Sequence, residues 1–176
     1  MKKILFVPYF LASLLVAIPA LAMEGVGVIN MRDAVLGTQV AQDALKALSE
    51  ETDYAADIEK ATLLQTERQA LAEKLQKDGE TLAQEEIVDI QRDIQEKGQE
   101  IEFIIGKVQA KQNQTIEKIF ADINPTLQKI LSELIAAKEV KLLLSQENVL
   151  FSDPALVLTD DVTSLLDVAL AEGQNE

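Results

Sequence analysis

Paired carboxylates are the side chains in this sequence best suited to acid–base catalysis or metal binding. Glu85 and Glu86 form one pair, and Asp160 and Asp161 form another. Neither pair lies in a loop of alternating oxygen ligands with a suitably placed glycine, which a calcium site requires. The sequence also contains no histidine and no cysteine, the residues most used for proton transfer near neutral pH, metal binding and thiol chemistry. We therefore predict no enzyme, no metal site and no cofactor, and a carboxylate hydrolase is the weakest hypothesis.

The first 22 residues, MKKILFVPYFLASLLVAIPALA, have the pattern of a cleavable export signal. Two lysines precede an apolar run from Ile4 to Ile18, and Ala20-Leu21-Ala22 is a typical cleavage site. An uncleaved membrane anchor fits less well, because spanning a bilayer takes roughly 20 apolar residues. We predict a signal peptide over residues 1–22 and no membrane span in the mature chain.

The mature chain would be strongly acidic. Cleavage removes two of the 16 basic residues and none of the 30 acidic ones, which leaves a net charge of −16 on 154 residues. Such a surface repels the phosphates of nucleic acids and of anionic lipids. Four aromatic residues remain, too few for a surface on which bases stack. We therefore predict no nucleic-acid partner.

The apolar residues predict one short strand followed by a long helical hairpin. The strand lies within residues 23–32, where EGVGVIN leads to a helix cap at Asn30 or Asp33. Over residues 33–124 the apolar residues form a narrow stripe with spacings of three, four and seven, which is typical of a coiled coil. Residues 77–80 interrupt the pattern, and Gly79, a residue that tolerates left-handed geometry, indicates the hairpin tip. The alternative is one continuous helix, whose stripe a second chain would have to cover.

The predicted hairpin is long enough to project from the rest of the molecule as an arm. Each limb would extend about 65 to 70 Å at 1.5 Å per residue. Pro125 lies inside the helical pattern, where it removes a backbone hydrogen bond and clashes with a preceding carbonyl group. We expect a kink at Pro125 that acts as a hinge between the arm and a base.

Residues 125–176 are predicted to form the rest of that base. They contain the end of the returning helix, two strands at Val140 to Ser145 and Asn148 to Phe151, and a final helix capped by Thr159. Three short strands and a helix cannot bury a core of their own, and their edges would be exposed. We predict an α+β fold in which a small β-strand body is shared between the chains of an oligomer and carries a long antiparallel coiled-coil hairpin arm.

Three segments resemble the Skp/OmpH family of periplasmic chaperones. They are VGVINMRDAV after the signal, the central helical hairpin, and the closing AAKEVKLLLSQENVLFSDPALVLTDDVTSLLDVAL. The resemblance implies a homotrimer whose strands form a small barrel-like body and whose three hairpins surround a cavity. Unfolded outer-membrane proteins would be held there in the periplasm, without ATP, and protected from aggregation.

The charge of the arm departs from the family pattern. Typical members are strongly basic, whereas residues 49–102 of this chain contain 6 basic and 16 acidic side chains. Residues 103–141 contain 6 basic and 4 acidic side chains. A mechanism for this chain would therefore depend on apolar contacts and enclosure rather than on attraction of acidic clients.

Seven residues of the arm are candidates for contact with a client. The apolar candidates are Tyr54, Ile58, Phe103, Ile104 and Phe120, and the basic candidates are Lys107 and Lys111. The alternative for the apolar residues is packing within the hairpin or against the base. The alternative for the lysines is a solvated face paired with nearby glutamates.

A protein of a different class would also fit the sequence. Acidic coiled-coil arms can recruit one folded partner, which would make the chain an envelope scaffold without chaperone activity. Saturable binding of one native partner, with no suppression of aggregation, would favour the scaffold over the chaperone.

Overall fold

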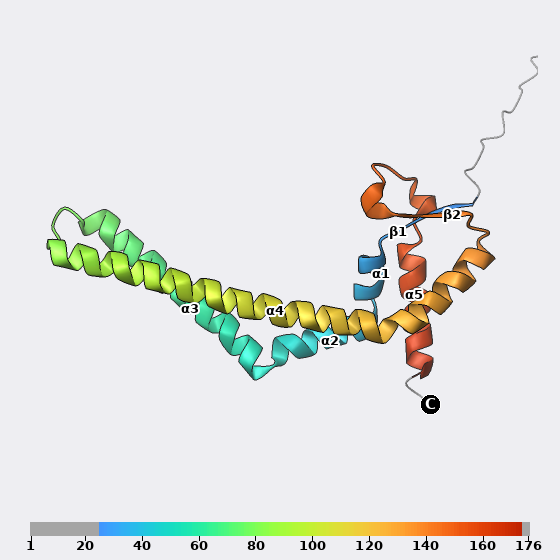
Figure 1. Cartoon of the computed structure of the whole chain (residues 1–176), viewed down its shortest axis with the longest axis horizontal. Helices are drawn as coiled ribbons and strands as arrows, with labels where there is room; N and C mark the ends of the chain where they lie inside the picture. The colour runs from blue at the N-terminus through green and yellow to red at the C-terminus, as the bar shows by residue number, and fades with distance from the viewer. Residues whose placement is uncertain (1–24, 174–176) are drawn as a thin grey trace, which may run out of the picture.

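The computed structural model describes residues 25–173 and consists of a base and a long projecting arm (Figure 1). The predicted signal peptide lies outside the described residues. The elements are β1 (Val26–Ile29), α1 (Met31–Leu36), α2 (Gln39–Glu50), α3 (Thr52–Asp78), α4 (Gln84–Ala137), β2 (Leu142–Ser145), the short 3-10 helices Gln146–Asn148 and Pro154–Leu156, and α5 (Thr159–Gly173). None of the helices in the described part of the chain combines the length and apolar character needed to cross a membrane.

The strands of the base form a two-stranded parallel sheet. The register runs from Val26 opposite Leu142 to Ile29 opposite Ser145. On the other side of β1, the N–H of Leu158 donates to the carbonyl oxygen of Val28 at 2.8 Å. The prediction of a second C-terminal strand at Asn148 to Phe151 is wrong, because Asn148 closes a 3-10 turn and Phe151 is exposed. An apolar run becomes a strand only where a neighbouring strand pairs with it, and the sheet of the described chain contains only β1 and β2.

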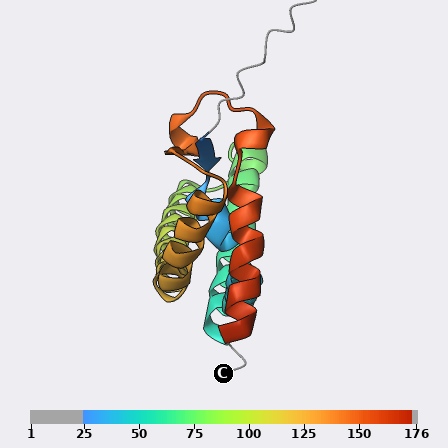
Figure 2. The same ribbon diagram turned by 90° about the vertical axis from the view of Figure 1, so that its right-hand side faces the viewer.

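The core of the base forms where α1 and β1 lie between the end of α4 and α5 (Figure 2). Its fully buried members include Ala34, Val35, Val162 and Leu166. Helix α1 begins after Asn30, whose side-chain oxygen accepts from the N–H of Asp33 at 3.1 Å. The prediction that Thr159 caps α5 needs correction. Its hydroxyl oxygen instead accepts from the backbone N–H of Asn30 at 3.0 Å, which joins the start of α5 to the end of β1.

The outgoing limb is not the single helix that the apolar spacing predicts. It breaks at Gly37 and Thr38, and again at Glu51, whose ψ of 127° is extended. Thr38 is fully buried, and its hydroxyl oxygen accepts from the N–H of Ala41 at the start of α2. Asp167 of α5 accepts from the N–H of Gln39 at 2.7 Å. Capping contacts of this kind favour separate helices over a continuous one, and periodicity does not reveal them.

The tip of the hairpin lies between the end of α3 at Asp78 and the start of α4 at Gln84. Gly79 does not adopt left-handed geometry, since its φ is −56° and its ψ is −29°. A Cβ at this position would lie 2.4 Å from the carbonyl oxygen of Leu75. The tip therefore requires glycine because the backbone approaches closely and not because φ is positive.

Helix α4 returns from the tip to the base without interruption and contains Pro125 within its 54 residues. It changes direction where it reaches the base (Figure 1). Loss of one backbone hydrogen bond at a proline allows such a bend. Motion of the arm about Pro125 stays a prediction.

Replacing Gly106 by alanine is expected to raise the free energy of unfolding by about 0.5–1 kcal/mol. Gly106 lies in the interior of α4, and no atom lies within 4 Å of the position that its Cβ would occupy. Gly79→Ala is the control and should be destabilising, because its Cβ would meet the backbone at 2.4 Å. Urea unfolding followed by circular dichroism measures both changes. A loss of stability in Gly106→Ala would contradict the prediction.

Candidate functional site

The arm projects from the base, and most of its surface is not covered by the base. Its interior is a small apolar cluster of Leu64, Ile101 and Ile104, with Ala61 and Val108 packed against it. This cluster is separate from the core of the base. The two limbs therefore hold each other through a narrow seam, and most side chains of the arm face outward.

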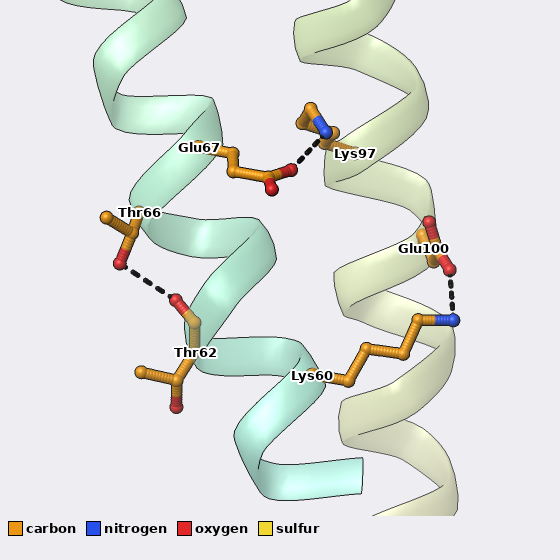
Figure 3. A network of polar contacts seen from close by, with 6 residues as sticks. All are labelled: Lys60, Thr62, Thr66, Glu67, Lys97 and Glu100. Carbon is orange, nitrogen blue, oxygen red and sulfur yellow. Dashed lines mark hydrogen bonds and ion pairs between the residues drawn. The ribbon is translucent and has the colours of Figure 1, made fainter. Parts of the chain in front are cut away.

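Ion pairs join the two limbs from the tip toward the base. Lys74 and Glu86 lie 2.6 Å apart, Lys60 and Glu100 lie 2.5 Å apart, and Lys107 and Asp57 lie 2.7 Å apart. Figure 3 shows two rungs of this series, Lys60 with Glu100 and Glu67 with Lys97. In an antiparallel hairpin, the residues that face each other have residue numbers with a constant sum. Here each rung adds to between 160 and 164, which fixes the register of the arm.

Two lysines of these rungs are held in their charged form by their partners. A hydrogen bond from Lys97 to the Glu67 carboxylate raises the pKa of Lys97 above its ordinary value of 10.5. A hydrogen bond from Lys111 to Glu51 raises the pKa of Lys111 in the same direction. Both lysines therefore stay protonated at any physiological pH and serve as structural cations of the arm.

The structure divides the apolar client-contact candidates into exposed and packed residues. Phe103 is 74% exposed and Ile58 is 44% exposed, so both are accessible in this chain. The expectation for Ile104 needs correction, because only 4% of it is exposed and it packs inside the hairpin. Tyr54 is half-buried between the limbs. Phe120 packs against the core of the base, so it too is occupied within the chain.

The two basic candidates are both paired within the arm. Lys107 contacts Asp57, and Lys111 donates a hydrogen bond to Glu51. Lys118, on the same helix, pairs with Asp122 at 2.6 Å. Each of these lysines is therefore ion-paired within the chain, as the alternative to client contact expects, and contact of Lys107 and Lys111 with a client stays a prediction.

Sequence reasoning missed most of the exposed apolar residues. On the arm they include Leu63, Val88 and Ile105, at 56%, 51% and 43% exposure. On the base, Leu150 is fully exposed and Phe151 is 86% exposed. The sequence predicted Leu150 and Phe151 to lie in a strand, so it gave no indication that their side chains would be exposed. The exposure of Leu63, Val88 and Ile105 depends on how α3 and α4 are aligned with each other.

The hollows on the arm are shallow and open. One, of about 210 Å³, lies across the limbs and is lined by Gln65, Arg68, Gln69, Ala72 and Ile94. Another is lined by Asp93, Glu96, Lys97 and Glu100. Across residues 25–173, no three acidic side chains gather in a way that would hold a metal ion. The geometry suits contact along a surface rather than enclosure of a small ligand.

Comparison with known proteins identifies a family and similar solved structures. The model of the family "Outer membrane protein (OmpH-like)" matches residues 25–166. A crystal structure of a candidate outer membrane chaperone (OmpH-like) from Caulobacter crescentus CB15 is 24% identical and has a TM-score of 0.47, with 84% of this chain and 86% of that chain covered. No curated protein is similar to the chain.

Proposed function

We infer the function from one premise: this chain belongs to the OmpH-like outer membrane protein family, whose model matches most of its length. The resemblance of its sequence to the Skp/OmpH chaperones supports a chaperone role toward outer-membrane proteins. We propose that the chain is an ATP-independent periplasmic holdase. It binds unfolded outer-membrane proteins in a cavity between helical arms and prevents their aggregation.

The observation that carries this proposal is the arm. Helix α3 alone has 27 residues and is about 40 Å long at 1.5 Å per residue. Along this length, exposed apolar residues are spread over both limbs rather than gathered in one pocket. A surface of this kind offers many weak contacts to an extended chain and no single tight site. That property suits a protein that must release its client unfolded.

A cavity requires more than one arm, and the base favours assembly. Leu142, Leu150 and Phe151 are exposed on it, at 52%, 107% and 86%. Burial of these side chains against another copy would remove apolar surface from water and could pair the free edge of β2. A homotrimer, as the family resemblance implies, would place three arms around one space.

The charge of the chain decides how clients are held. Residues 49–102 carry a large excess of acidic groups, so capture of acidic clients by attraction is weak. Apolar contact and enclosure do not depend on the sign of the client's charge. Repulsion between the acidic arms also keeps neighbouring complexes apart in solution.

The test is refolding of a denatured outer-membrane barrel protein in the presence of the purified mature chain. Light scattering is followed against the concentration of the oligomer at low and at high salt, with an unrelated acidic protein as the control. We expect suppression of aggregation that saturates near one oligomer per client and persists in high salt. Saturable binding of one native protein without any suppression would replace the holdase with the scaffold function.

A further inference from the structure

The burial pattern of the arm defines the two sides of its seam. On α3 the buried and half-buried residues are Tyr54, Asp57, Ala61, Leu64, Leu71 and Leu75, with spacings of three, four and seven. On α4, between Ile87 and Thr115, the buried and half-buried residues at the same spacings are Ile87, Ile90, Ile94, Lys97, Ile101, Ile104, Val108, Lys111 and Thr115. Asp93 and Gly98, next to this row on opposite sides, are half-buried as well. Residues adjacent to these positions lie on one or the other flank of the hairpin. In an antiparallel pair, equivalent flank positions of the two helices meet on the same side.

One side, the charged flank, carries ionisable residues at eight flank positions. They are Asp53, Lys60, Glu67 and Lys74 on α3, and Glu86, Asp93, Glu100 and Lys107 on α4. The contacts confirm that these positions share a side. Lys60 pairs with Glu100 (Figure 3). Lys74 pairs with Glu86 nearer the tip, so the flank positions of the two helices meet across the hairpin.

The opposite side, the uncharged flank, has no ionisable residue at the corresponding positions. They are Ile58, Gln65 and Ala72 on α3, and Gln91, Gly98, Ile105 and Gln112 on α4. Among the described residues, none of these takes part in the ion pairs between the limbs. The open hollow that contains Gln65, Ala72 and Ile94 shows that the two helices also meet on this side.

The uncharged flank is largely accessible, and the residues at its own positions are isoleucine, glutamine, alanine and glycine. Ile58 and Ile105 are 44% and 43% exposed, and their residue numbers place them opposite each other in the register of the hairpin. Gln65, Gln91 and Gln112 are exposed. Each glutamine amide offers two donors and an acceptor, which match the N–H and C=O groups of any peptide backbone. The Arg68 guanidinium, which lies beside Gly98, adds further donors for carbonyl groups.

We propose that the uncharged flank is the surface of the arm that contacts an unfolded polypeptide. The isoleucines contact apolar side chains of that polypeptide, and the glutamines exchange hydrogen bonds with its peptide groups without regard to sequence. This inference rests on the proposed holdase function and adds the side of the arm that performs it. On the charged flank, six of the eight ionisable residues form ion pairs across the hairpin, so contact there would have to break ion pairs.

A second folded copy of the arm is a poorer occupant of this surface. A stable interface between folded proteins needs an apolar, well-packed centre and roughly 1,000 Å² or more of buried surface. The uncharged flank has isoleucines at one level of the hairpin and glycine, alanine or glutamine at the others. An unfolded chain can instead adapt its own side chains to this sparse pattern.

Two alanines of α3 allow a direct test. Ala72 is exposed on the uncharged flank, whereas Ala70, two residues earlier and also exposed, lines a hollow with Lys74 and Asp93 of the charged flank. The chain has no cysteine, so Ala72→Cys and Ala70→Cys each give one labelling site for an environment-sensitive fluorophore. We expect unfolded outer-membrane protein to shift the emission of the label at 72 and to leave the label at 70 nearly unchanged. Equal shifts at both sites would overturn the inference.

Matched charge changes give the second test. Gln65→Glu with Gln91→Glu adds two carboxylates to the uncharged flank, and Gln99→Glu with Gln114→Glu adds two elsewhere on α4. We expect the first pair to weaken binding of the unfolded protein about tenfold, because buried carboxylates lose hydration, and the control pair to leave it within about twofold. Equal effects, or a changed oligomeric state in the first pair alone, would overturn the inference.

These outcomes separate the two proposals. If the unaltered chain suppresses aggregation but the two flanks respond alike, the assignment of the flank fails and the holdase function stands. If the unaltered chain neither suppresses aggregation nor binds unfolded protein, both fail together.

Discussion

Aspartate at positions 150 and 151 is expected to dissociate the proposed oligomer into monomers. Leu150 and Phe151 are 107% and 86% exposed in the single chain, on the base and away from the arm. Complete burial of such a side chain is worth about 1.5–3 kcal/mol, so loss of both costs about 4 kcal/mol per chain. That loss corresponds to roughly a thousandfold weaker association. Sedimentation equilibrium of Leu150→Asp with Phe151→Asp at micromolar concentration measures it.

The control for this experiment carries the same added charge on the arm. Leu63→Asp with Val88→Asp alters two residues of similar type that are 56% and 51% exposed. We expect this variant to sediment as the unaltered oligomer does. If the unaltered chain is itself a monomer, or if the base variant keeps its mass, the shared base is excluded and the cavity between arms loses its support.

Truncation of Leu166 is expected to lower the free energy of unfolding by about 3 kcal/mol, within the usual range of 2–5 kcal/mol for a buried leucine. Leu166 is completely buried in the core of the base, where α5 packs with α1 and α4. Alanine there removes the packed atoms and leaves a cavity. Urea unfolding followed by circular dichroism measures the loss. The concentration of chains must be the same for all variants, since assembly adds to stability.

The neighbouring leucine provides a matched control. Leu165 is 40% exposed on the same helix, so Leu165→Ala removes the same atoms with less loss of packing. We expect a change below about 1 kcal/mol for it. A loss for Leu166→Ala as small as that for Leu165→Ala would mean that α5 does not stabilise the base as the structure indicates.

The α+β class and the helical hairpin were predictable because both follow from local patterns. A narrow apolar stripe indicates a helix that needs a partner helix, and the interruption at Gly79 locates the turn. The closing segments resembled one family, and the family match over residues 25–166 confirms that resemblance. Patterns of this kind depend on residues near each other along the chain.

The contacts of the arm were not predictable in the same way. Lys107 and Lys111 are paired, Ile104 is buried and Phe103 is exposed because of the register between α3 and α4. If one helix were rotated about its axis by one residue, different side chains would face the other helix. The pairing of both lysines and the exposure of Ile104 and Phe103 would then change, although the apolar pattern of the sequence would be the same. The breaks at Thr38 and Glu51 likewise depend on local capping and on contact with α5 and α4.

The sequence by itself determined that this protein is a helical arm on a small mixed base, because helix periodicity and turn residues act locally. The tertiary structure alone decided which strand pairs with β1, why Gly79 must be glycine, and which flank of the arm has no ionisable residue at its flank positions. The physical reason is that each of these depends on atoms brought together from distant parts of the chain. Their positions are fixed only when the limbs settle into one register and α5 packs on the base.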